Sequence, residues 1–336
     1  MVTAEEVAAR AGVSRATVSY VISGRKPISE RTKQRVRKAM EELGYVPNAN
    51  ARALAGRRSY MIGVVTTVDA RMPVDEFAPY FLSILDVAHA RGYEVVLIPK
   101  DEGMGGVRRL TGQSLVDGLI VFDVERRDER LPQLVQLGVP VVLFGTPEDS
   151  HGLICVDPDH RCEGRMCVDE LVRVGSQRII YVGDRVPVRD RFLFSSRFER
   201  SVVDNAAKAG VAIDVYHPAT ADWRGMDGLK SLLVEGVAAR YGIITRTTWA
   251  LDLVLDVLKD LGLMPGYDVA MTGVCPDDYV NRLRVPLSNV DQRSQEQAKI
   301  GAGALLDIIE GKRVAVMGPV SPAFTARAST DMLWTA

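Results

Sequence analysis

The side chains best suited to chemistry in this sequence lie at residues 14–20, and the chemistry that they suit is base recognition. Arg15 can present a bidentate fork to guanine, and Ala16 is small enough to touch a thymine methyl group or to let a helix approach DNA closely. Ser19 and Tyr20 stand in the same segment. These residue types predict contacts with base edges, provided that the segment forms a helix that lies in the major groove.

Catalytic and metal-binding patterns are not found in the sequence. No GxSxG, P-loop or HExxH motif occurs, and the carboxylates and histidines are scattered along the chain. The four cysteines, Cys155, Cys162, Cys167 and Cys275, show no CxxC spacing, which favours free buried thiols over a metal or redox site. We therefore expect no enzyme activity, no cofactor and no metal.

Three short helices are predicted to position the base-reading side chains. Their ends are marked by cap residues: Thr3 with Glu6 and then Gly12 for the first helix, Ser14 for the second (residues 15–22), and Ser29 and Gly44 for the third. Two short helices joined by a tight turn that contains glycine are typical of the helix-turn-helix motif, whose second helix reads the major groove. On this pattern alone, a three-helix unit that binds protein remains an alternative.

The net charge of −1 conceals an uneven distribution. Residues 1–60 carry twelve Lys and Arg against five Glu, whereas the remaining 276 residues carry 30 basic and 38 acidic side chains. A basic head on a mildly acidic body is the layout expected when only the head contacts a polyanion.

The chain resembles the lactose/galactose repressor (LacI/GalR) family of transcription regulators, most specifically in its first 58 residues. The family's VSxxTVSxV recognition helix is matched by residues 13–21, and its LGYxPNxxAxxLxG block by residues 43–56. The resemblance implies a sequence-specific regulator, most often a repressor, and it rejects the protein-binding alternative. The head residues that it places at the DNA are Thr3, Ser14, Arg15, Ala16, Thr17, Ser19 and Tyr20.

A second DNA-binding element is implied at residues 48–55. This segment could form a helix of only two turns, which is too short to be stable alone in water. By resemblance it is a hinge helix that orders when two subunits lie together over the minor groove. Leu54 then matches a wedge that enters the central base step and kinks the duplex, with Asn48 and Ala51 beside it and Arg52 at a phosphate.

Behind residue 60, short β-branched runs alternate with amphipathic segments. The predicted strands lie at residues 61–65, 94–98, 118–122, 139–144, 178–182, 211–216, 242–245 and 268–273. Continuous apolar strands separated by helices predict an α/β fold with parallel sheets covered on both faces. In such folds, ligands bind beyond the carboxyl ends of the strands.

The body resembles the periplasmic-binding-protein-like effector domain, in which two subdomains close on a ligand. We expect a helix-turn-helix domain at residues 1–46, a hinge helix and linker at 47–60, and an effector-binding and dimerisation domain at 61–336. Subdomain 1 is expected to comprise about residues 61–158 and 291–320, and subdomain 2 about 159–290 and 321–336.

The resemblance implies a small-molecule effector, a sugar or sugar derivative. Trp223 matches a ring that stacks on a sugar or base, and Arg197 matches a cleft arginine, although the glycine usual three residues later is missing. Further candidates for the effector site are Asp69, at the end of the first strand, and Phe77 and Tyr80, near the mouth of the cleft.

Two positions depart from the family pattern. Arg246 stands where an amide is usual, and Cys275 stands where an acid is usual. Together with Arg161 and Arg197, Arg246 could line a cleft suited to an anionic effector. A buried guanidinium needs an acidic partner, which could belong to the ligand or to a protein acid such as Asp277 or Asp278.

Recognition helices and leucine wedges that work in pairs imply a homodimer on a two-fold operator in double-stranded DNA. A dimer is favoured over a tetramer because the sequence ends without a leucine-heptad tail. The polar start predicts no secretory signal, and no apolar run approaches the roughly 18–20 residues of a membrane span, so we expect a cytoplasmic protein.

Two alternatives for the body remain open. Its cleft could be vestigial, with a protein partner supplying the signal, which the altered positions 246 and 275 keep possible. It could also be a catalytic α/β domain, which has only generic support from the fold class.

Overall fold

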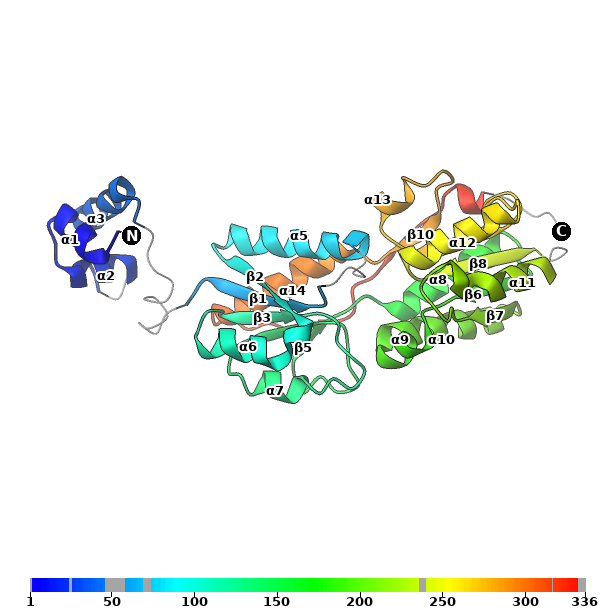
Figure 1. Cartoon of the computed structure of the whole chain (residues 1–336), viewed down its shortest axis with the longest axis horizontal. Helices are drawn as coiled ribbons and strands as arrows, with labels where there is room; N and C mark the ends of the chain where they lie inside the picture. Colours follow the sequence, from blue (N-terminus) through cyan, green and yellow to red (C-terminus); the bar gives the residue numbers. More distant parts are fainter. Residues whose placement is uncertain are drawn as a thin grey trace.

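The computed structural model describes residues 2–23, 26–45, 58–68, 74–235, 240–315 and 317–331. Figure 1 shows a head of three helices and a larger body in which two sheets are flanked by helices. Some predicted site residues lie outside the described residues. They are the hinge residues Asn48, Ala51, Arg52 and Leu54, and the effector candidate Asp69.

The head consists of α1 (Ala4–Ala11), α2 (Arg15–Ser23) and α3 (Glu30–Leu43). The predicted caps are confirmed. Thr3 and Glu6 form a capping box in which the Glu6 carboxylate accepts from the Thr3 amide at 2.7 Å, and the Ser29 hydroxyl accepts from the Thr32 amide at 3.3 Å. These bonds satisfy amides that have no partner inside the helix.

The turn between α1 and α2 has a specific structure. Gly12 adopts a φ of 62°, the left-handed conformation that glycine accepts at little cost. The Arg35 guanidinium, from α3, donates to the carbonyls of Ala11 and Gly12 and so ties the third helix to this turn. Val18 of α2 and Val36 of α3 are fully buried in the core that results.

The first sheet of the body has five parallel strands in the order β2-β1-β3-β4-β5. Their bounds are β1 Met61–Thr66, β2 Glu94–Pro99, β3 Gly118–Val121, β4 Val141–Phe144 and β5 Ile154–Val156. One face packs against α5 (Val74–Ala90) and α14 (Ser294–Ile309), and the other against α6 (Gly103–Gly112) and α7 (Leu131–Val135), as Figure 1 shows. The short helix η1 (Lys100–Glu102) follows β2.

The second sheet has six strands in the order β11-β10-β9-β8-β6-β7, all parallel except β11. Their bounds are β6 Arg178–Val182, β7 Ala212–Tyr216, β8 Tyr241–Thr245, β9 Ala270–Val274, β10 Ser288–Asp291 and β11 Ala323–Thr325. One face packs against α8 (His160–Arg173) and α10 (Leu193–Lys208), and the other against α11 (Asp227–Glu235) and α12 (Thr248–Asp260). The shorter helices of this half are α9 (Val186–Arg191), η2 (Trp223–Met226), α13 (Asp277–Val280) and η3 (Ala328–Thr330).

The eight strands predicted from apolar runs are confirmed, to within a few residues at their ends. Three strands were not predicted. β5 and β11 have three residues each, and β10 reads Ser-Asn-Val-Asp, which is too polar to be distinguished from a loop. Its Ser288 and Asn289 are nevertheless fully buried, because their side chains bond to neighbouring backbone carbonyls.

The chain passes repeatedly between the two halves of the body. β5 of the first sheet leads through residues 157–159 into α8 of the second half, and β10 leads through 292–293 back to α14. A third segment runs alongside, since the Val320 amide donates to the Asp157 carbonyl at 2.9 Å and the Asp159 amide to the Val320 carbonyl at 3.0 Å. Within the described ranges, no helix is both long and apolar enough to span a bilayer.

Candidate nucleic-acid interface and effector cleft

The helix α2 presents its polar side chains outward. Arg15, Ala16 and Ser19 are exposed, whereas Val18 on the opposite side is fully buried. The Ser14 hydroxyl accepts from the Thr17 amide at 3.1 Å and lies 2.9 Å from the Thr17 hydroxyl, so it caps the helix as predicted. The helix is therefore anchored by its apolar face while its polar face is free to contact a ligand.

Arg15 is held only weakly by its own chain. Its Nη1 lies 3.4 Å from the Glu5 carboxylate, and both side chains are more than 70% exposed. Such an exposed pair contributes about 0–1 kcal/mol, so the guanidinium can leave it for a base edge at little cost. Tyr20, further along the helix, is partly buried and carries the Lys26 ammonium 5.0 Å from its ring centre.

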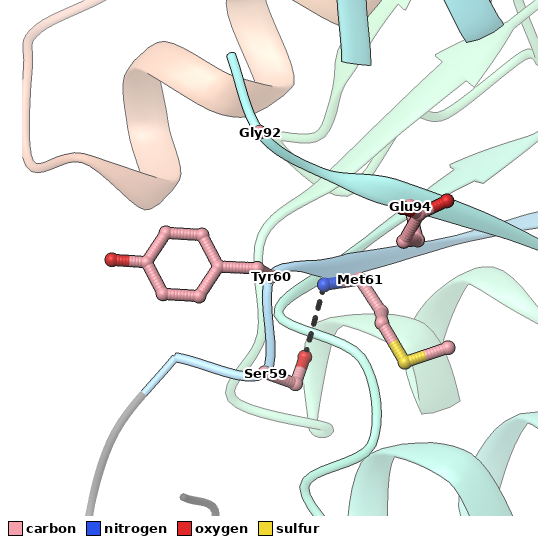
Figure 2. A pocket seen from close by; sticks show the side chains of 5 residues that line it. All are labelled: Ser59, Tyr60, Met61, Gly92 and Glu94. Atoms are coloured by element: carbon pink, nitrogen blue, oxygen red, sulfur yellow. Dashed lines mark hydrogen bonds between the residues drawn. The ribbon is translucent and has the colours of Figure 1, made fainter. Parts of the chain in front are cut away.

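A shallow pocket of about 410 Å³ lies where the chain enters the body, at the amino ends of β1 and β2 (Figure 2). It is lined by Ser59, Tyr60, Met61, Gly92 and Glu94, and the Met61 amide donates to the Ser59 hydroxyl at 3.2 Å. Because ligands of α/β folds bind at the opposite, carboxyl edge of the sheet, we assign no effector role to this pocket.

At the carboxyl edges, the two halves of the body contact each other. We use the term seam for the residues that make these contacts. They are Asp75, Glu76, Lys100, Glu125 and Arg126 from the first half, and Asp190, Arg191, Phe192, Ser196, Thr248 and Arg282 from the second.

The α5 side of the seam is built around Glu76. Its Oε1 accepts from both the backbone amide and the hydroxyl of Thr248, each at 2.8 Å, so a carboxylate of the first half caps α12 of the second. A carboxylate at a helix N-terminus is also favoured by the helix dipole. Beside it, the Arg282 guanidinium lies 3.0 Å from Asp75. Burial raises the pKa of Glu76, although the Thr248 amide opposes this shift.

The other side of the seam is formed by Arg126 and the segment 190–196. Arg126 donates from its side chain to the Asp190 carbonyl at 3.1 Å and to the Ser196 hydroxyl at 2.8 Å. Its backbone amide donates to the Arg191 carbonyl at 2.7 Å. The Arg191 guanidinium lies 2.6 Å from Glu125, and the Lys100 ammonium lies 5.8 Å from the centre of the Phe192 ring. Both sides of the seam are thus closed by the chain's own groups.

Arg246 stands two residues before Thr248, directly after β8, and it is paired. Its Nε and Nη2 donate to the two carboxylate oxygens of Asp184 at 2.5 and 2.9 Å. The expectation that an acid meets Arg246 is confirmed, but the acids proposed for this role were wrong. Asp277 contacts Arg327 at 2.7 Å instead, and Asp184, two residues beyond β6, takes the place proposed for Asp277 or Asp278.

The Arg246–Asp184 pair is firmly supported. β6 and β8 are neighbours with Val182 opposite Thr245, which brings the residues that follow them together. The Ser195 hydroxyl donates to Asp184 at 2.5 Å, and the Phe194 ring lies 4.7 Å from the guanidinium carbon. Burial alone would raise the pKa of Asp184, but the attraction and hydrogen bonds of Arg246 outweigh it and lower that pKa.

Phe77 and Tyr80 lie on α5, packed against rings at the ends of β3 and β4. Phe77 makes an edge contact with Phe122 at 5.0 Å, and Tyr80 makes edge contacts with Phe122 and Phe144 at 5.7 and 5.9 Å. Burial raises the pKa of Tyr80, so its hydroxyl stays protonated. These two candidates are therefore part of an aromatic cluster on the carboxyl side of the first sheet.

The remaining effector candidates are placed differently from one another. Arg197 on α10 lies 3.8 Å from Asp157, and Arg161 is exposed in the first turn of α8. Trp223 on η2 is 66% exposed, with the Arg224 guanidinium 5.0 Å from its ring. Cys275 is buried directly after β9, and burial raises the pKa of its thiol well above the usual value. Arg161, Arg197 and Arg246 thus do not form a set of unpaired cations.

A buried charged cluster lies where the chain crosses between the halves. The two ring nitrogens of His160 are 2.9 Å from Glu163 and 3.1 Å from Asp157, and Gln292 donates to Glu163 at 2.9 Å. Burial alone would lower the pKa of His160, but the two carboxylates outweigh it and raise the pKa to about 10. The ring is therefore charged at neutral pH and donates to both acids.

Two acids that hold this region together, Glu76 at the seam and Asp184 beside Arg246, were not found from the sequence. Asp184 and Glu76 are ordinary acids in the sequence, and only the strand order brings Asp184 to Arg246. One signal was present for Asp184, since it closely follows a predicted strand, where ligand-binding side chains of α/β folds stand. No comparable signal marked Glu76, which lies inside a helix.

Two family models match the chain. The model described as "Bacterial regulatory proteins, lacI family" matches residues 3–48, and the "Periplasmic binding protein-like domain" matches residues 168–330. Among curated relatives, the HTH-type transcriptional regulator CelR of Thermobifida fusca is 29% identical over 330 residues, covering 92% of each chain. The probable HTH-type transcriptional regulator EndR of Paenibacillus polymyxa is 26% identical over 317 residues, covering 92% of this chain and 91% of EndR.

Solved structures show the same architecture. A CelR–cellobiose complex aligns with a TM-score of 0.68 at 26% identity and covers 98% of this chain and 100% of its own. The lac repressor dimer bound to operator and the anti-inducer ONPF aligns with a TM-score of 0.82 at 22% identity, covering 98% and 99%. The latter similarity concerns the fold alone.

Proposed function

Because the chain belongs to the LacI/GalR family of DNA-binding transcription regulators, which are not enzymes, we propose that it is a repressor that binds a two-fold operator as a homodimer and releases or holds it in response to a sugar or sugar derivative. The observation that carries this proposal is the recognition helix α2, whose polar face, with Arg15, Ala16 and Ser19, is exposed above a buried apolar face. A regulator of this kind acts on DNA in the cytoplasm.

The rest of the DNA interface belongs to the same proposal. Thr3, Ser14, Thr17 and Tyr20 would contact the backbone or base edges around α2. In the hinge, Leu54 would enter the minor groove with Asn48, Ala51 and Arg52 beside it. We keep the proposed domain limits of 1–46, 47–60 and 61–336 for these parts.

The effector would bind at the carboxyl edges of the two sheets, where the seam lies. Support comes from the solved CelR complex, which holds cellobiose. Phe77, Tyr80 and Trp223 are candidates for stacking on a sugar face, and Arg197 and Arg246 are candidates for polar contacts. Asp69, Arg161 and Cys275 complete the proposed site.

A second candidate is a regulator whose body no longer binds a small molecule and takes its signal from a protein partner. Two observations favour it: Glu76 of the seam already caps the N-terminus of α12, and Arg246 beside the seam is already paired with Asp184. In this alternative the body would remain closed whatever small molecules are present.

Operator binding with and without ligands tests the proposal and separates the two candidates. The expected result is nanomolar binding of the full chain to one DNA site, measured by fluorescence anisotropy, with a change in affinity of tenfold or more on addition of one neutral sugar from a panel. Specific binding that no member of the panel changes would favour the protein-partner candidate. Binding of equal strength to all DNA sequences would contradict the proposal as a whole.

A further inference from the structure

The cations at the seam are already matched with carboxylates of the chain. Lys100 and Arg191 both contact Glu125, at 3.1 and 2.6 Å, and Arg282 contacts Asp75 at 3.0 Å. Arg126 lies 3.6 Å from Glu148. Each of these cations therefore has a carboxylate partner of the chain, although Lys100 and Arg191 share Glu125.

Arg246 lies in the second half, two residues before Thr248 of the seam, and it is less exposed than any of the seam cations. Its side chain is 12% exposed, and that of Asp184 is 4% exposed. The two hydrogen bonds between them form a bidentate pair, which is the strongest geometry for an arginine and a carboxylate. An anionic ligand would have to displace a carboxylate that is already fixed, oriented and buried.

Asp184 is also held by residues other than Arg246. Ser195 donates to the same Oδ2 that accepts from Arg246 Nε, and the backbone carbonyl of Asp184 lies 2.7 Å from Nδ1 of His217. The Phe194 ring covers one face of the guanidinium and stacks on Phe192 at 5.2 Å. The carboxylate therefore cannot swing away to make room for a ligand anion without breaking several contacts.

We propose that Asp184 sets the charge class of the effector, so that the site accepts an uncharged polyhydroxylated ligand and rejects phosphorylated or carboxylated ones. This inference rests on the proposed function, since it concerns the same effector site. The fixed carboxylate and the guanidinium offer an acceptor and donors for hydroxyl groups. This proposal replaces the expectation of an anionic effector, which rested on Arg246 in the sequence.

The proposal predicts that loss of the carboxylate reverses the charge preference. In D184N the buried guanidinium loses its partner, and an unpaired buried charge attracts an anion. We expect inorganic phosphate to bind D184N at least tenfold more tightly than it binds the wild-type chain. Isothermal titration calorimetry measures both affinities. The double variant D184N/R246Q should lose this gain, because it has no guanidinium.

Two further variants keep the test decisive. Glu76 also attracts Arg246 electrostatically and could replace the lost carboxylate, so the double variant D184N/E76Q removes both acids. The matched control is D214N, which breaks the Arg178–Asp214 pair, with Nε–Oδ2 at 2.5 Å. Arg178 is the first residue of β6 and Asp214 lies in the middle of β7, away from the carboxyl ends of the strands. D214N should bind phosphate no better than the wild-type chain does.

The wild-type protein gives a second measurement that needs no variant. Operator-release assays should compare glucose and cellobiose with glucose 6-phosphate and gluconate. Release by a neutral sugar but by neither anion supports the proposal, and release by an anion overturns it. Equal phosphate affinity in the wild type, D184N and D184N/E76Q overturns it as well. Should no sugar of either class act, the effector part of the proposed function fails, and the phosphate titrations still decide the role of Asp184.

Discussion

At the scale of the residue, the proposed DNA interface uses side chains that the fold leaves without strong partners. Arg15 has only an exposed pair with Glu5, whereas Arg35 in the same head is fully used by the carbonyls of Ala11 and Gly12. The two arginines look alike in the sequence. Their contacts separate a residue available to DNA from one that holds the helix-turn-helix together.

Arg15→Ala should weaken binding to the cognate operator by about 1–3 kcal/mol and relax the preference at one base pair in each half-site. The reason is the loss of a bidentate contact to guanine. Anisotropy titrations on operators mutated one base pair at a time measure both effects. The matched control is Arg10→Ala, because Arg10 lies on α1 and contacts Glu42. An equal loss of affinity on every DNA sequence would show that Arg15 contacts only phosphate.

At the scale of the secondary-structure element, the range of the stabilising contacts explains which parts of the fold could be predicted. The head could be predicted almost completely, because capping residues such as Thr3, Ser14 and Ser29 act within one helical turn. Apolar strands of four to six residues were found for the same reason, since their pattern is local. β10 was missed because its buried Ser288 and Asn289 are satisfied by distant carbonyls, such as those of Arg327 and Cys275.

The region proposed for the effector was predicted less well than the head, for a physical reason. Its key pairs join residues far apart in the chain: Asp184 and Arg246 have a sequence separation of 62, and Glu76 and Thr248 a separation of 172. The need for an acid beside Arg246 followed from electrostatics. Which acid supplies it depends on strand order, which the local pattern does not contain.

Removal of a helix cap tests how the first helix of the head is stabilised. Thr3→Ala deletes the hydroxyl of the capping box and should destabilise α1 by about 0.5–2 kcal/mol. Amide hydrogen exchange of residues 4–11 should become faster, while exchange of the body stays unchanged. Thr3→Ser keeps the hydroxyl and should restore the wild-type rate. Unchanged exchange in Thr3→Ala would mean that tertiary packing alone holds α1.

The proposed hinge gives a second test of an element. Leu54→Ala should reduce the bend of operator DNA and the specific affinity while leaving the body's dimer intact, because the wedge that unstacks the central base step is shortened. Circular-permutation gel assays report the bend, and sedimentation reports the dimer. A wild-type bend angle with a normal footprint would remove Leu54 from the proposed interface.

The whole molecule is organised around contacts between the two halves of the body. Glu76 caps α12 on one side of the seam, and Arg126 holds segment 190–196 on the other. The charged cluster of His160, Asp157 and Glu163 lies where the chain crosses between the halves. Any motion of the two halves against each other would have to rearrange these groups.

His160 should make the stability of the body depend on pH. Its pKa is raised from 6.5 to about 10 by the two carboxylates, so the stabilisation is fully present below pH 6.5 and is lost as the pH rises through about 10. The urea midpoint of the wild-type chain should fall over this range, and that of His160→Gln should fall less. His89→Gln, which alters an exposed histidine on α5, is the control and should keep the wild-type slope. Parallel curves for His160→Gln and the wild type would contradict this role for the cluster.

The central claim is that the full chain reads a two-fold DNA sequence through paired copies of α2, and selection from a random duplex library tests it most directly. Successive rounds of binding and sequencing should enrich one palindromic motif, with half-sites about one helical turn of roughly 10 base pairs apart, as expected for paired recognition helices. Arg15→Ala should enrich a related motif with one degenerate position in each half. A library that remains unenriched after binding, or a motif without two-fold symmetry, would contradict the account.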